Sequence, residues 1–218
     1  MGGLSVADAR LKVTEPLRRL RWWIPSAVVR RKLPRQFVME RMPKHSVGAE
    51  IGVWLGDFSA LALRVVKPQA LHLIDPWKYE PDPAYQKSQY GGEKGCGQAR
   101  MDLIFSLALK RFKRDIASGV VCVHRSPSTA AVATFPDDYF DWVYIDGNHQ
   151  YEFVRKDLEA FYPKVKSDGL IAGDDYGHDG WWQGGVTRAV DEFVARGLGE
   201  VVLIEDSQFV LRKKGQAR

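Results

Sequence analysis

The chain has 218 residues, of which 45% are hydrophobic and 27% are charged. This supplies enough apolar material for one substantial core, so the composition excludes a chain that is disordered throughout. No apolar run reaches the roughly 18 residues of a membrane span, and two cysteines, Cys96 and Cys122, are too few for a disulfide framework or a zinc site. We therefore expect a cytosolic protein with one main domain and an appendage.

Positive charge is concentrated in the first 46 residues. They hold eleven Lys or Arg and three acidic residues, a net charge of +8, whereas the whole chain carries +5. Interleaved apolar residues, including Trp22 and Trp23, predict helices that pack against another surface. We expect residues 1–46 to form a basic helical arm that shapes a binding site or a homodimer interface, and residues 47–218 to form the main domain. A basic arm that binds nucleic acid is the alternative.

From residue 47 onward, strand-like runs alternate with helical patterns, which is typical of a parallel sheet with crossover helices in an α/β fold. Strands are predicted at 48–51, 70–74, 120–124, 142–145, 170–172, 201–204 and 208–212, and helices at 59–66, 99–116, 128–133, 151–162 and 185–196. Three residues separate the last two strands, so we expect a hairpin and an antiparallel last strand. Residues 78–98, rich in Tyr, Pro and Gly, predict a long binding loop or lid.

A glycine-containing loop joins the first predicted strand to the first helix. Its sequence is Glu50-Ile51-Gly52-Val53-Trp54-Leu55-Gly56-Asp57-Phe58-Ser59. Gly52 and Gly56 permit a tight turn and a close approach to a ligand. A dinucleotide site normally has G-x-G-x-x-G, but Trp54 stands at the middle glycine, which disfavours NAD and FAD. Asp75 ends the second strand, where an acid accepts hydrogen bonds from both hydroxyls of a ribose.

This combination resembles the class I S-adenosylmethionine-dependent methyltransferases over about residues 47–212. The resemblance implies a Rossmann-like seven-stranded sheet with an antiparallel last strand and helices on both faces. It also implies that S-adenosylmethionine is the cofactor. The matching positions are Glu50, Gly52, Gly56 and Ser59 for the cofactor loop, Asp75 for the ribose, and Ser126 for the adenine.

Acidic residues follow the fourth and fifth predicted strands, in Asp146-Gly147-Asn148-His149 and in Asp174-Asp175. Because the carboxyl ends of parallel strands share one edge of a sheet, we expect these carboxylates to converge. Three oxygen donors suit Mg, Mn or Ca better than zinc. His149 lies beside them, and its unperturbed pKa of about 6.5 suits general-base catalysis.

The acidic cluster resembles metal-dependent O-methyltransferases that act on sugar or glycoside hydroxyls in natural-product and polysaccharide pathways. The resemblance implies that Asp146, Asp174 and Asp175 hold a divalent ion, usually Mg, and that His149 is the base. Asp146 is an alternative base. The expected acceptor is a small molecule or an oligosaccharide, with a catechol-like or other phenolic hydroxyl as the alternative. Trp181 and Trp182 follow the acidic pair, and they either stack on sugar rings or form a buried plug.

Overall fold

The computed structural model describes residues 35–92 and 96–214. These residues belong to a compact unit that spans residues 34–218. Most of the predicted arm, with Trp22 and Trp23, lies outside the described residues. Its last part contains helix α2 (Gln36–Arg41), and Val38 and Met39 on this helix are buried in the core. Within the described ranges, no helix is long and apolar enough to cross a membrane.

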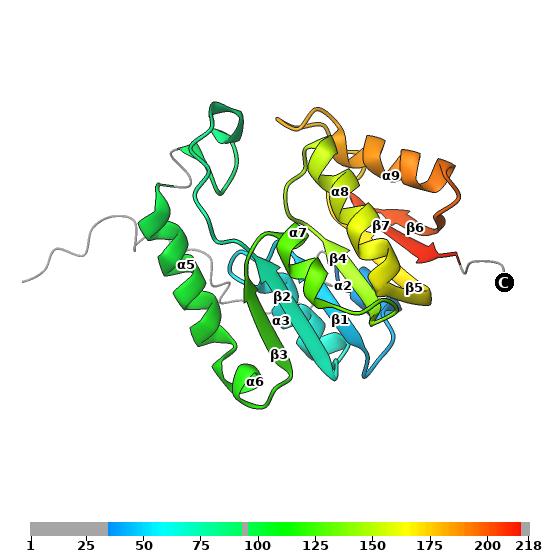
Figure 1. Cartoon of the computed structure of the whole chain (residues 1–218), viewed down its shortest axis with the longest axis horizontal. Helices are drawn as coiled ribbons and strands as arrows, with labels where there is room; N and C mark the ends of the chain where they lie inside the picture. The colour runs from blue at the N-terminus through cyan, green and yellow to red at the C-terminus, as the bar shows by residue number, and fades with distance from the viewer. Residues whose placement is uncertain (1–34, 93–95, 215–218) are drawn as a thin grey trace, which may run out of the picture. The chain divides into compact units, whose positions relative to one another are not determined.

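Seven strands form one sheet in the order β3-β2-β1-β4-β5-β7-β6 (Figure 1). They are β1 (Val47–Ile51), β2 (Ala70–Asp75), β3 (Val121–Arg125), β4 (Phe140–Ile145), β5 (Val165–Gly173), β6 (Gly199–Glu205) and β7 (Gln208–Lys213). The first five strands pair in parallel, whereas β7 is antiparallel to both β5 and β6. The predicted Rossmann-like sheet with an antiparallel last strand is confirmed.

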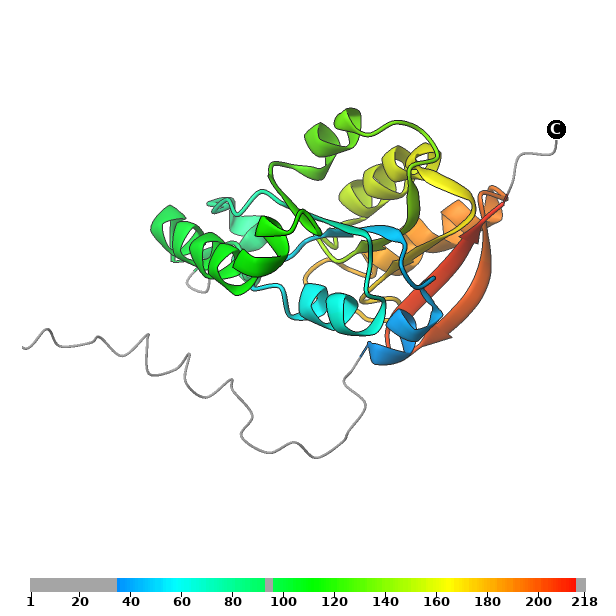
Figure 2. The same ribbon diagram turned by 90° about the horizontal axis from the view of Figure 1, so that it is seen from below.

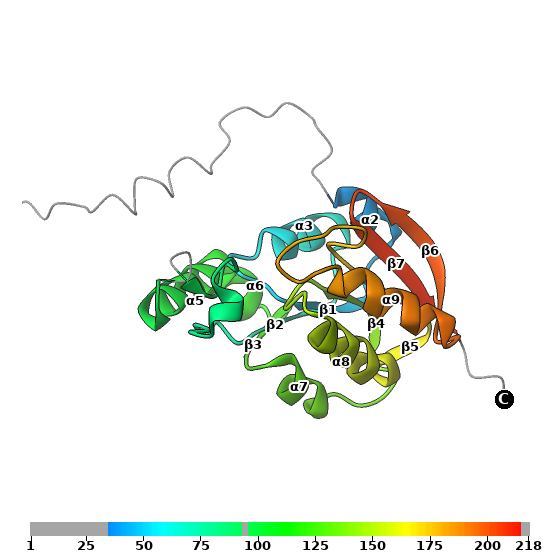
Figure 3. The same ribbon diagram turned by 90° about the horizontal axis from the view of Figure 1, so that it is seen from above.

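Helices cover both faces of the sheet, each over its own apolar cluster (Figures 2 and 3). One face carries α2, α3 (Asp57–Val65) and α5 (Gln98–Arg111), and the other carries α7 (Ser128–Ala131), α8 (Tyr151–Phe161) and α9 (Gly185–Ala195). Short elements complete the described chain: α6 (Lys113–Ala117), η2 (Pro83–Tyr85), η3 (Val132–Thr134) and η4 (Tyr162–Lys164). Burial of both sheet faces explains why the central strands read as continuous apolar runs.

Two elements differ most from the sequence prediction. The helix predicted over 99–116 ends at Arg111 and resumes as α6, because Phe112 takes a non-helical conformation (ψ 15°). Its buried ring lies under the glycine loop, where a Cβ on Gly56 would come within 2.4 Å of it. Strand β5 begins at Val165, five residues before the predicted start, since its polar beginning gave no apolar signal.

Candidate active site

The glycine loop packs against the start of the acidic cluster at the carboxyl edge of the sheet. The Gly52 amide donates to the Ile74 carbonyl at 2.9 Å, and the Asp146 amide donates to the Ile51 carbonyl at 2.8 Å. Gly52 has φ +88°, and a Cβ there would lie 2.1 Å from the Asp146 carbonyl oxygen. Both its conformation and its surroundings therefore require glycine.

Glu50 and Ser59 fasten strand β1 to helix α3 beneath this loop. Both side chains are buried, and the Ser59 hydroxyl donates to a Glu50 carboxyl oxygen. Complete burial raises the pKa of Glu50 well above its ordinary value, although the bond from Ser59 opposes this effect. The pair stabilises the loop from within the core. A direct contact of either residue with the cofactor stays a prediction.

Asp75 is fully buried at the end of β2, and its carboxylate accepts hydrogen bonds from other groups of the protein. Oδ2 accepts the backbone N–H groups of Val53 (2.8 Å) and Trp54 (3.0 Å), and Oδ1 accepts that of Trp77 (2.6 Å). The Tyr90 hydroxyl also donates to Oδ2. Asp75 thus orders the glycine loop, and the Tyr90 contact demonstrates that a hydroxyl donor fits at this carboxylate. This is the kind of donor that a ribose supplies.

Tyr90 comes from the long loop after β2, and several contacts hold it in place. Its carbonyl accepts the Glu80 amide at 2.9 Å, and its ring packs edge-on against Trp54 with centroids 5.1 Å apart. Sequence reasoning marked this loop as a binding loop but did not identify Tyr90. Because the Tyr90 hydroxyl bonds Asp75 Oδ2, a ribose hydroxyl that bonds this oxygen as predicted would displace it.

Ser126, the residue predicted to contact adenine, lies in a bend directly after β3 and is half-buried. Its neighbour Arg125 reaches back to the Trp77 carbonyl at 3.3 Å, pairs with Asp102 and stacks over the Phe105 ring. These contacts fix the chain at this end of β3. The contact of Ser126 with adenine stays a prediction.

The predicted acidic cluster does assemble at the edge of the sheet, with two basic partners. Arg35 donates Nη1 to Asp146 Oδ2 at 2.8 Å and Nη2 to Asp174 Oδ2. His149 lies between Asp146 and Asp175, with Nε2 3.3 Å from Asp146 Oδ1 and Nδ1 2.8 Å from Asp175 Oδ2. Sequence reasoning did not identify Arg35, because it counted this residue only among the charges of the arm.

The carboxylates control the protonation of His149. Burial alone would lower its pKa, but the bonds to Asp146 and Asp175 outweigh this desolvation and raise the pKa to about 9. The imidazole is therefore protonated at neutral pH in this arrangement. Arg35 and His149 together compensate most of the charge of the three carboxylates.

The metal prediction fits the donor chemistry of this cluster in part. Asp146 and Asp174 supply carboxylate oxygens, the donor type that a hard cation prefers, but one oxygen of each carboxylate bonds Arg35. Asp175 is turned toward His149 instead. Within residues 35–92 and 96–214, no group of three His, Cys, Asp or Glu side chains is arranged to hold a metal ion. The three-carboxylate metal site stays a prediction.

Aromatic residues from two loops lie beside the cluster. Trp182 packs edge-on against His149 (centroids 4.9 Å) and against Trp181 (5.9 Å), and Trp181 packs against Tyr85 (5.5 Å). The Tyr85 hydroxyl accepts a bond from Asn148 at 2.7 Å. The indole N–H of Trp182 is buried and has no hydrogen-bond partner among the described residues. Both predicted alternatives for the tryptophans remain compatible with this packing.

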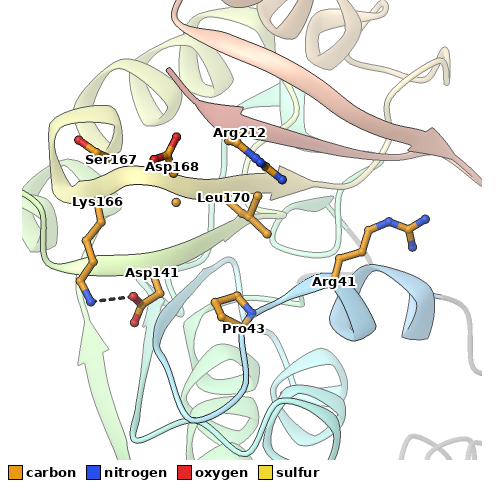
Figure 4. A pocket seen from close by; sticks show the side chains of 9 residues that line it. Arg41, Pro43, Asp141, Lys166, Ser167, Asp168, Leu170 and Arg212 are labelled. Carbon is orange, nitrogen blue, oxygen red and sulfur yellow. Dashed lines mark hydrogen bonds and ion pairs between the residues drawn. The ribbon is translucent and has the colours of Figure 1, made fainter. Parts of the chain in front are cut away.

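Two open cavities among the described residues lie away from the centre of this site. One of about 540 Å³ lies between the loop that contains His178 and Asp179 and the start of α9. The other, of about 370 Å³, lies at the end of β4 and β5 that is far from this site, where Arg41, Arg212 and the Lys166–Asp141 ion pair line it (Figure 4). At the site itself, Tyr90 bonds the Asp75 carboxylate and Arg35 bonds that of Asp146.

Comparison with known proteins identifies the family. A family model described as a methyltransferase domain matches residues 49–176, which include the glycine loop, Asp75 and the acidic cluster. The chain belongs to this methyltransferase family. With its class I fold, this makes it an S-adenosylmethionine-dependent methyltransferase. No curated protein matches the chain by sequence.

Solved structures share the fold of this methyltransferase at low sequence identity. The O-methyltransferase NovP is 19% identical with a TM-score of 0.57, over 83% of this chain and 80% of that one. A Streptococcus mutans protein in complex with SAH is 10% identical with a TM-score of 0.53, over 84% and 96%. A methyltransferase from Geobacter sulfurreducens is 16% identical with a TM-score of 0.54, over 97% and 91%.

Proposed function

We propose that this methyltransferase transfers the methyl group of S-adenosylmethionine to a hydroxyl oxygen of a saccharide or glycoside. The observation that carries the proposal is the position of the acidic cluster. The Asp146 carbonyl lies against Gly52 of the cofactor loop, and its carboxylate lies within hydrogen-bonding distance of His149. A cofactor on the glycine loop would thus have titratable groups beside it, which a hydroxyl acceptor needs in order to lose its proton.

The aromatic residues next to His149 support a sugar as the acceptor. Trp181 and Tyr85 come from different loops and meet edge to face, and aromatic faces of this kind stack on the apolar faces of sugar rings. The buried Trp182 N–H needs an acceptor, since leaving such a group unpaired costs about 1–3 kcal/mol. A sugar hydroxyl supplies one. The oxygen specificity of NovP agrees with a hydroxyl acceptor.

For the chemistry we propose His149 as the base, with Asp146 as the alternative. Both groups lie at the site, 3.3 Å apart. The contacts with Asp146 and Asp175 keep His149 protonated at neutral pH, so it accepts a proton only when those contacts are released and its imidazole is neutral. We further propose that Asp146, Asp174 and Asp175 would hold Mg. When bound, a divalent ion polarises and orients the acceptor oxygen. The oxygen-only donor set favours Mg or Mn over zinc.

The proposal is tested by methyl transfer from trideuteromethyl-labelled S-adenosylmethionine to a panel of glycosides, catechols and tRNA, read by mass spectrometry. We expect label on glycoside hydroxyls, loss of transfer in EDTA and recovery with Mg. Label found only on catechols would mean that the acceptor is a phenolic hydroxyl and not a sugar hydroxyl. Label in tRNA would replace the saccharide acceptor with a nucleic acid, and full turnover in EDTA would rule out the proposed metal.

A further inference from the structure

The guanidinium of Arg35 holds the position at which two of the predicted metal ligands meet. Its Nη1 lies 2.8 Å from Asp146 Oδ2, and its Nη2 bonds Asp174 Oδ2. The Arg35 side chain is 32% exposed, whereas those of Asp146 and Asp174 are 18% and 10% exposed. The guanidinium therefore enters a mostly buried pair of carboxylates from the solvent side and bridges them.

The remaining oxygens of these two carboxylates have other partners. Asp146 Oδ1 faces His149 at 3.3 Å. Asp174 Oδ1 accepts the Asp175 amide at 2.9 Å and the side-chain amide of Gln208. Among the described residues, Asp146 Oδ2 and Asp174 Oδ2 are thus the two carboxylate oxygens that bond the same cationic group, the Arg35 guanidinium.

We propose that Arg35 and a divalent metal ion are alternative counter-ions of the Asp146–Asp174 pair, so that the metal binds only when Arg35 leaves. This inference rests on the proposed metal site. A guanidinium and a divalent cation repel each other at contact distance, and they cannot both occupy the same two oxygens. The apparent metal affinity of the wild type then equals the intrinsic affinity multiplied by the fraction of molecules in which Arg35 is released.

The release of Arg35 has a structural consequence. Arg35 is the N-cap of α2, with a left-handed backbone (φ 74°), and Val38 and Met39 anchor this helix in the core. Metal binding is thereby coupled to the side chain of the residue that caps the start of α2.

The experiment is Mn²⁺ binding to the full-length protein, measured by electron paramagnetic resonance of the free ion. Arg35→Gln removes the bridging charge and should tighten Mn²⁺ binding roughly tenfold or more, because no charge-assisted bonds need to break. Arg41→Gln is the matched control on the same helix. Arg41 bonds only the Phe37 carbonyl among the contacts described for it, and the substitution should leave the affinity unchanged.

Arg35→Lys separates bridging from simple repulsion. It keeps the charge but cannot bind two carboxylates in the planar, two-pronged way of a guanidinium. We expect an intermediate affinity, and circular dichroism establishes that each variant is folded. If Arg35→Gln binds Mn²⁺ as tightly as the wild type, or more weakly, the competition between Arg35 and the metal is overturned. The proposed metal site itself would be unaffected by that result. Absence of Mn²⁺ binding in every variant would overturn both.

Discussion

The contact between Tyr90 and Asp75 leads to a prediction about cofactor affinity. If the ribose takes the place of the Tyr90 hydroxyl, wild-type binding includes the loss of a bond between a hydroxyl and a buried carboxylate. Such charge-assisted bonds contribute about 1.5–3 kcal/mol. Tyr90→Phe removes this cost but keeps the ring that packs on Trp54. We therefore expect S-adenosylhomocysteine to bind about tenfold tighter or more, since about 1.4 kcal/mol corresponds to a factor of ten.

Isothermal titration calorimetry of S-adenosylhomocysteine measures this effect, with Tyr79→Phe as the control. Tyr79 lies on the same loop and packs against the same apolar cluster, but its substitution leaves the Asp75 contacts intact. The ligand should also raise the thermal midpoint more for Tyr90→Phe than for the wild type. An unchanged or weaker affinity in Tyr90→Phe would refute the replacement of the Tyr90 hydroxyl by the ribose. It would mean that the Tyr90–Asp75 bond is kept when the ligand is bound.

Three further predictions concern stability and catalysis. Burial raises the pKa of Asp157 to about 6 despite the bond from a serine hydroxyl. The contribution of Asp157 to stability is thus present below about pH 4 and is lost as pH rises through 6. Asp157→Asn should therefore stabilise the protein by roughly 3 kcal/mol at pH 7.5 and by little at pH 4, as measured by urea unfolding. Gly52→Ala should abolish cofactor binding in calorimetry and lower the thermal midpoint, whereas Gly147→Ala, whose added Cβ would be 3.6 Å from its nearest neighbour, should be mild. His149→Ala should slow methyl transfer by roughly 10² to 10⁴ with cofactor affinity unchanged; a wild-type rate would transfer the base role to Asp146.

The sequence was sufficient to predict the sheet because its strands carry a local signal. The central strands are buried on both faces, so apolar runs such as 142–145 locate them to within about two residues. The polar start of β5, around Lys166 and Asp168, lacks that signal and was missed. The break at Phe112 was missed for a related reason, because it follows from packing under a distant loop and not from any helix-breaking residue.

The acidic cluster was predictable because strand ends and sheet topology together place Asp146 next to Asp174. The basic side chain that bonds these carboxylates, Arg35, was not predictable. Arg35 lies 111 residues from Asp146 and 139 from Asp174 in the sequence, and nothing in its local pattern distinguishes it from other arginines of the arm. Tyr90 is likewise one of several tyrosines in its loop. Only the folded chain shows which side chain reaches which carboxylate.

The most direct measurement of the central claim is a crystal structure of the full-length protein with S-adenosylhomocysteine and Mn²⁺. The account predicts the ligand on the Gly52 loop, its ribose hydroxyls on Asp75 with Tyr90 displaced, and an anomalous Mn peak between Asp146 and Asp174. Ligand bound elsewhere, with the Tyr90–Asp75 contact retained, would contradict the cofactor site on which the proposed methyl transfer depends.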